Sequence, residues 1–138
     1  MISVQTIVSK IYSETGYTTQ FARSADQDLL EVTEGVRISV GYGPIRSSNP
    51  EQAIAYSAYE LQGENNIQSF YVVICCTADI FDTVFKNVYK ALKGYNPSGE
   101  ESLHTSFTFS NGEPLGFNNT MFLFRQEWKI GFPTNSIL

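Results

Sequence analysis

The chain has 138 residues, of which 42% are hydrophobic and 14% aromatic, and its formal net charge is −5. This apolar content excludes a disordered chain, and the length predicts a single domain with a real core over residues 1–138. The negative charge argues against a protein that binds nucleic acid by neutralising phosphates. No apolar run approaches the roughly 20 residues of a membrane-spanning helix, and we expect no signal peptide and no membrane contact.

The N-terminal segment is the first predicted element. Residues 2–15 place apolar side chains at helical spacing, with Ser3 positioned to cap the first turn and Gly16 to end the helix. The segment 17–35 is mostly polar, and within it residues 29–32 can form a short edge strand.

Strand patterns dominate the next part of the chain. Residues 36–42 alternate between apolar and polar side chains, which predicts a half-buried strand that is broken at 41–44 and followed by a loop at 45–50. Residues 53–62 are ambiguous, because their tyrosines favour a strand and their alanines permit a helix. We expect a strand that pairs, through a turn at 63–66, with the central strand described next.

The stretch 67–99 organises the prediction. Residues 70–76 form a continuous apolar run typical of a strand that is covered on both faces. Asp79 can cap the helix that follows, Gly94 can end it in the left-handed conformation, and Pro97 prevents it from resuming. The apolar stripe of this helix comprises Ile80, Phe81, Val84, Phe85, Val88, Tyr89 and Leu92.

Two further strands complete the chain. Residues 103–109 alternate, residues 110–114 predict a turn, and residues 121–130 predict a final strand. Its first face comprises Phe122, Phe124, Trp128 and Ile130, and its second face comprises Met121, Leu123, Arg125, Glu127 and Lys129. Large apolar groups on both faces leave two alternatives: the second face contacts a partner chain, or a helix covers it. The order of elements predicts an α+β domain with a mostly antiparallel sheet and two helices packed on one face.

The chemistry-bearing residues form no recognisable catalytic, metal or cofactor site. His104 is the one histidine and falls on the polar face of a predicted strand, with no activated nucleophile nearby in the sequence. Cys75 and Cys76 are adjacent in the central strand, so their side chains point to opposite faces and cannot bond to each other. We expect two buried free thiols and, from them, a reducing compartment.

An acidic set stands out among the polar residues. It is either a solvated face or a lining that repels a polyanion. Its members are Asp26, Asp28, Glu31, Glu34, Glu60 and Glu64.

The order of elements resembles the tail terminator (tail completion) proteins of long-tailed bacteriophages. The resemblance extends over nearly the whole chain: an N-terminal helix, the strand Val-Arg-Ile-Ser-Val at 36–40, a long hairpin, and a helix that exits through Ala-Leu-Lys-Gly-Tyr-Asn-Pro at 91–97. A final aromatic strand, Met-Phe-Leu-Phe-Arg-Gln-Glu-Trp at 121–128, completes it. Such proteins are non-enzymatic virion components, without a cofactor, that assemble in the host cytoplasm.

The resemblance implies a ring, usually hexameric, that caps the tail tube, ends its polymerisation and joins the tail to the head–neck connector. The acidic set would then face the lumen, where genome DNA passes without binding. Candidate interface residues are Tyr42, Pro44, Ile45, Met121, Leu123 and Arg125. The alternatives are a head–neck adaptor or tail-tube protein of the same virion, and a small α+β ligand-binding domain or enzyme with a deep polar pocket.

Overall fold

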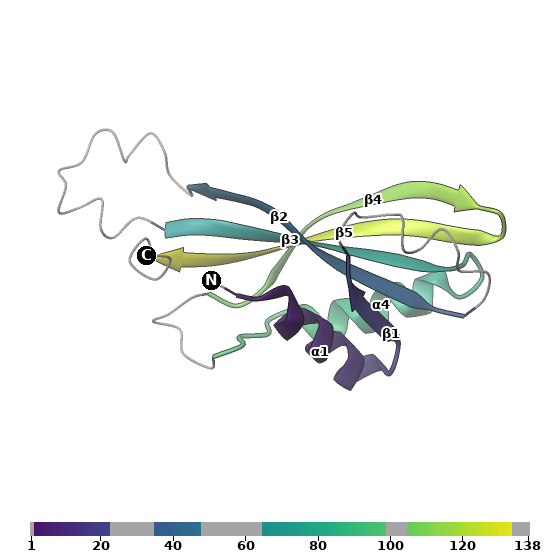
Figure 1. Ribbon diagram of the computed structural model, residues 1–138, viewed down its shortest axis with the longest axis horizontal. Coiled ribbons are helices and arrows are strands. Elements are labelled where there is room, and N and C mark those ends of the chain that lie inside the picture. Colours follow the sequence, from purple (N-terminus) through teal and green to yellow (C-terminus); the bar gives the residue numbers. More distant parts are fainter. Residues whose placement is uncertain (1, 23–34, 48–64, 99–104, 134–138) are drawn as a thin grey trace.

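The computed structural model describes residues 2–22, 35–47, 65–98 and 105–133. Within these ranges the helices are α1 (Val4–Thr15) and α4 (Phe81–Leu92), and the strands are β1 (Thr18–Phe21), β2 (Arg37–Ser47), β3 (Asn65–Thr77), β4 (Thr108–Asn118) and β5 (Met121–Pro133). The strands form one twisted sheet in the order β1-β2-β3-β5-β4 (Figure 1). Strand β1 is parallel to β2 and the other neighbours are antiparallel, so the predicted α+β class with a mostly antiparallel sheet is confirmed.

Strand β3 lies at the centre of the sheet, as predicted. Its residues from Val72 to Cys76 are almost completely buried, because β2 and β5 pair with its two edges and side chains cover both of its faces. Cys75 and Cys76 are not joined in a disulfide and belong to different hydrophobic clusters, as expected for adjacent strand positions.

The cap of α1 agrees with the sequence, and the cap of α4 does not. The Ser3 side chain accepts a hydrogen bond from the Gln5 N–H at 3.2 Å, and Gly16 ends α1 with φ of 75°. Helix α4 starts after Ile80 with no side-chain cap, so the prediction that Asp79 caps it is wrong. The chain reaches α4 through a backbone turn, in which the Ile80 N–H donates to the Thr77 carbonyl at 3.3 Å.

One large hydrophobic cluster joins both helices to the sheet. The helices contact each other, and Figure 1 shows them side by side. The strand residues in the cluster occupy alternate positions along β2, β3 and β5. The buried members of the cluster are Val4, Ile7, Val8, Ile11, Ile38, Val40, Phe70, Val72, Ile74, Cys76, Val84, Val88, Leu92, Phe107, Trp128 and Ile130.

Two strands are longer than the sequence predicts. Strand β2 continues through 41–44, with a register shift between Tyr42 and Ile45 in place of the predicted break. Strand β4 continues through 110–114, and the turn lies instead at 119–120, where Asn119 adopts a left-handed φ of 56°. Glycine and proline are tolerated in β4 because it is an edge strand that pairs with one neighbour only among the described strands.

The pairing of the central strand also differs from the prediction. The two edges of β3 pair with β2 and β5. The predicted strand at 53–62, the predicted edge strand at 29–32 and His104 lie outside the described residues. Strand β1 was not predicted, because it is short and polar and lacks strict alternation.

Candidate subunit interface

Exposed apolar side chains gather at the edge of the sheet formed by β1 and β2. We call this group the Tyr42 surface, defined by Phe21, Tyr42 and Ile45. Tyr42 is 53% exposed, and its ring lies against Phe21 at a centroid distance of 6.3 Å. Its hydroxyl accepts a hydrogen bond from the Val4 N–H at 3.1 Å, so the ring is held in place although it is exposed.

A second exposed group lies at the opposite edge of the sheet. We call it the Phe117 surface, defined by Leu115 and Phe117 of the edge strand β4. Phe117 is 64% exposed, the highest value among the large hydrophobic side chains that the structure describes. Its ring packs on Phe122 at 5.0 Å, and Phe122 contacts Phe81 at 5.0 Å, so Phe117 is the outermost ring of an aromatic row that leads into the core.

The register of the sheet separates the two surfaces. Tyr42 pairs with Phe70 of β3, whereas Phe117 pairs with Phe122 and so lies in the row of Cys76. The six steps along β3 from Phe70 to Cys76 correspond to roughly 20 Å, and the three strand spacings from β2 to β4 add roughly 14 Å across the strands. The surfaces are therefore distinct and cannot form one continuous patch.

Both edges are poorly suited to pairing with another strand. Strand β2 contains Pro44 and the register shift beside it, and β4 contains Pro114 between two register shifts. Proline and bulges at a sheet edge interrupt the row of hydrogen-bonding groups that an added strand needs. A partner at either edge would therefore bind mainly through side chains.

Two hollows flank Tyr42. The larger has a volume of about 420 Å³ and is open to solvent, and it is lined by Ile2, Ser3, Tyr42, Gly43, Ile45 and Gln68. Gln68 holds the backbone of Ile2 beside β3, because its side chain accepts a hydrogen bond from the Ile2 N–H at 3.1 Å and donates one to the Ile2 carbonyl at 3.0 Å.

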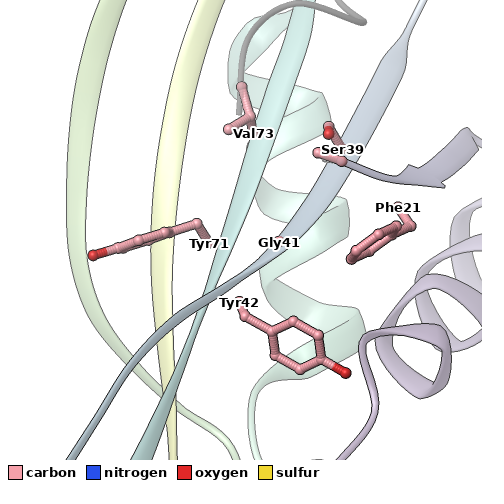
Figure 2. Close-up of a pocket in the computed structure, with 7 residues that line it drawn as sticks. Phe21, Ser39, Gly41, Tyr42, Tyr71 and Val73 are labelled. Carbon is pink, nitrogen blue, oxygen red and sulfur yellow. The ribbon is translucent and has the colours of Figure 1, made fainter. Parts of the chain in front are cut away.

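The smaller hollow has a volume of about 210 Å³ and lies beside β2 at Gly41. Figure 2 shows the Phe21 and Tyr42 rings on one side of β2 and Tyr71 pointing away on the other side. Its described lining residues include no charged side chain, and their polar groups do not converge on one point. The volume is below the roughly 300–1,000 Å³ of small-molecule pockets.

A serine hydroxyl and two cysteine thiols are buried in the sheet. Ser39 lines the smaller hollow, but its hydroxyl is buried and has no hydrogen-bond partner among the described residues. Burial raises the pKa of the Cys75 thiol. Burial, with smaller contributions from Cys75 and Asp79, raises the pKa of Cys76 to about 11. A nucleophilic cysteine has a lowered pKa, whereas the pKa values of these two thiols are raised.

The structure separates the residues that the sequence proposed for an interface. Tyr42, Pro44 and Ile45 are exposed at one edge. Met121 and Leu123 are only 1% and 5% exposed and form a buried cluster with two residues of β3, so they offer no surface to a partner.

Arg125, the last residue of that set, already has intramolecular partners. Its guanidinium binds the Glu113 carboxylate at 2.6 Å and lies 4.7 Å from the centroid of the Tyr71 ring. The six acidic residues proposed for the lumen, which are Asp26, Asp28, Glu31, Glu34, Glu60 and Glu64, lie outside the described residues.

Sequence reasoning missed the Phe117 surface. Phe117 and Leu115 fall in a segment rich in glycine, proline and asparagine that resembles a loop, so no strand pattern drew attention to them. The available signal was the pair of aromatic residues, Phe117 and Phe122, that flank a polar turn.

Comparison with known proteins finds no family model that matches the chain and no curated protein with significant similarity to it. Among the described residues, neither helix has the length and apolar content needed to cross a membrane. In the same part of the chain, no three residues of the types His, Cys, Asp and Glu are grouped so that they could hold a metal ion.

Proposed function

We propose that this protein is a structural virion subunit similar to phage tail terminators. In this proposal, copies of the chain close into a ring, usually a hexamer in that family, that caps the tail tube and ends its polymerisation. The ring then joins the tail to the head–neck connector. It assembles in the host cytoplasm and ends in the virion at the head–tail junction.

The observation that supports the ring is the presence of two exposed apolar surfaces at opposite edges of one sheet. A two-fold dimer buries one patch against its own copy, whereas a ring repeats a contact between two different patches. Distinct surfaces, separated along and across the strands, fit the second arrangement.

The proposal takes α1 and α4 to pack on one face of the sheet, and the single cluster that they share with alternate strand residues supports this. The helices would then stabilise each subunit and leave both sheet edges free for neighbours. A helix-backed sheet with two free edges is a building block that can repeat around an axis.

A non-enzymatic role is part of the same proposal. The two thiols have raised pKa values, and none of the described residues that line the hollow around Gly41 is charged. These observations favour a structural role over nucleophilic or acid–base chemistry, which depends on titratable groups whose pKa values match their task.

Light scattering after gel filtration, together with negative-stain microscopy, tests the proposal. We expect particles of several subunits, each of 15.5 kDa, that appear as single rings and bind the ends of tail tubes. Long tubes formed by the protein alone would instead identify a tail-tube protein. A monomer at high concentration that does not bind tail tubes would contradict the ring.

The proposed lumen has its own test. If the six acidic residues line the channel, their replacement by lysine should make assembled rings retain DNA at low salt, because phosphates then find cations. Assembled rings that stay free of DNA after these substitutions would contradict an acidic lumen.

One observation favours a second candidate function. The solvent-open hollow of about 420 Å³ beside Tyr42 lies within the size range of small-molecule sites, as a ligand-binding α+β domain requires. Ligand-dependent shifts of the Ile45 and Gln68 resonances in a protein that remains monomeric would support this candidate and contradict the ring.

A further inference from the structure

The edge strand β4 contains the one Asn-Gly step of the sequence, at Asn111 and Gly112. The side-chain amide of an asparagine reacts with the main-chain nitrogen of the next residue, and glycine leaves that nitrogen unshielded because it has no side chain. Every other asparagine of the chain precedes a residue that has a side chain. Asn111 is therefore the asparagine at which this reaction is least hindered.

The part of β4 around Asn111 is weakly held. Residues 111–114 are the stretch of regular pairing with β5 between two register shifts, one on each side. Residues 110–115 are all exposed. Pro114 has no N–H with which to bind a neighbouring strand. Exposed segments with few buried apolar contacts open at a lower free-energy cost than core strands, so we expect this part of β4 to open locally.

The Asn111 side chain is exposed and forms no hydrogen bond or ion pair with the residues that the structure describes. Its partner across the strands is Glu127. The Glu127 carboxylate accepts a hydrogen bond from the Ser110 hydroxyl at 3.3 Å and lies 3.6 Å from the Lys129 ammonium group. These contacts engage Glu127 and leave the Asn111 amide free to approach the Gly112 nitrogen when the strand opens.

We infer that Asn111 is a deamidation site of the folded protein, reached by local opening of residues 111–114. The Gly112 nitrogen loses its proton and bonds to the Asn111 Cγ. The bond from Cγ to Nδ2 breaks, and the amide group takes up a proton and leaves as ammonia. Water then opens the resulting cyclic imide at either carbonyl and gives aspartate or isoaspartate. The reaction needs no oxidant or reductant, and the inference does not depend on the proposed ring.

Both products change the edge of the sheet. Aspartate at position 111 places a carboxylate directly opposite Glu127, and like charges in a cross-strand pair are unfavourable. Isoaspartate adds a carbon atom to the main chain inside the short regular stretch, so the pairing with β5 cannot keep its register. The amides of β4 should therefore exchange hydrogen faster in the deamidated protein than in the original one.

Mass spectrometry of the folded protein during prolonged incubation measures the reaction. The wild type should lose NH and gain O at one site, and faster at mildly alkaline pH than at neutral pH, because the attacking nitrogen must lose a proton. Peptide mapping should place aspartate and isoaspartate at position 111. Asn111→Gln should abolish the change, because the longer side chain closes a larger ring more slowly.

Asn119→Asp is the matched control. Asn119 lies in the exposed turn of the same hairpin, and aspartate tolerates its left-handed φ of 56°. This variant should deamidate at the wild-type rate. A change of mass that Asn119→Asp abolishes and Asn111→Gln leaves intact would overturn the inference, with circular dichroism showing that both variants are folded.

Two further measurements test the folded state and the local opening. A constant mass in the folded protein, with deamidation only after unfolding in urea, would overturn the inference because β4 would then protect Asn111. Ile11→Val weakens the core at a completely buried position of α1. Its rate should equal that of the wild type, whereas a rate that rises with the loss of global stability would contradict local opening.

Discussion

The aromatic side chains of this protein lie in two regions that differ in how far the rings are buried. Beneath α4, rings from the helix and from two strands pack together: Trp128 lies 5.4 Å from Tyr89 and 5.5 Å from Phe109, and it is completely buried. At the sheet edges, Tyr42 and Phe117 touch one or two rings each and leave more than half of their surface in water.

This difference indicates different roles. A buried ring stabilises the subunit through area removed from water, whereas an exposed ring contributes little to folding until a partner covers it. Substitutions in the first region should therefore lower the stability of the monomer, and substitutions in the second should change assembly alone. The expected effects on folding decrease from the buried rings toward the sheet edge.

The largest effect is expected at the centre of the buried region. Trp128→Ala should lower the free energy of unfolding by about 3–5 kcal/mol, because it removes a completely buried side chain and leaves a cavity. Urea denaturation followed by circular dichroism measures this. A loss below about 1 kcal/mol would show that the rings under α4 do not form the core as described.

A smaller effect is expected where the edge strand touches the buried rings. A Cβ on Gly112 would lie 2.8 Å from the Phe124 ring, which itself packs on Phe81 at 5.1 Å and cannot move freely. Gly112→Ala should therefore cost about 1–3 kcal/mol through overpacking. Asn111→Ala, at the exposed neighbouring position, is the control and should be nearly neutral in the same denaturation assay.

The buried thiol of Cys76 gives a pH test of the same core. Its pKa is about 11 in the folded protein, above the ordinary value, so between these two values the unfolded chain loses a proton that the folded chain keeps. Stability should therefore be level below the ordinary pKa and fall as the pH rises toward 11. In Cys76→Ala this part of the alkaline decline should disappear. Identical pH profiles for the two proteins would contradict the burial.

The smallest effect on folding is expected at the edge itself. Phe117→Ser should change the unfolding free energy of the monomer by no more than about 0.5 kcal/mol, because its ring is already mostly in water. Thermal melting at a concentration below that of assembly measures this. A loss comparable to that of Trp128→Ala would place Phe117 in the core and remove the distinction between the two regions.

Local patterns were sufficient for the helices and the central strand. The periodicity of residues 2–15 and 80–92 and the apolar run 70–76 correspond to α1, α4 and β3 because burial imposes its period on the sequence. The alternation of residues 121–130 likewise placed Phe124 and Trp128 on the side of β5 that faces α4. The α+β class followed from the order of these elements.

The extent of the edge strands and the position of the exposed rings depended on tertiary structure. Gly112 and Pro114 read as a turn in isolation, yet β5 provides the hydrogen bonds and the Phe124 ring that keep them in β4. Met121 and Phe117 are both large apolar residues close to the turn at 119–120. The packing of the sheet buries Met121 and leaves Phe117 exposed. Local sequence determines which backbone conformation a segment favours, whereas exposure depends on segments distant in the chain, whose arrangement exists only in the folded protein.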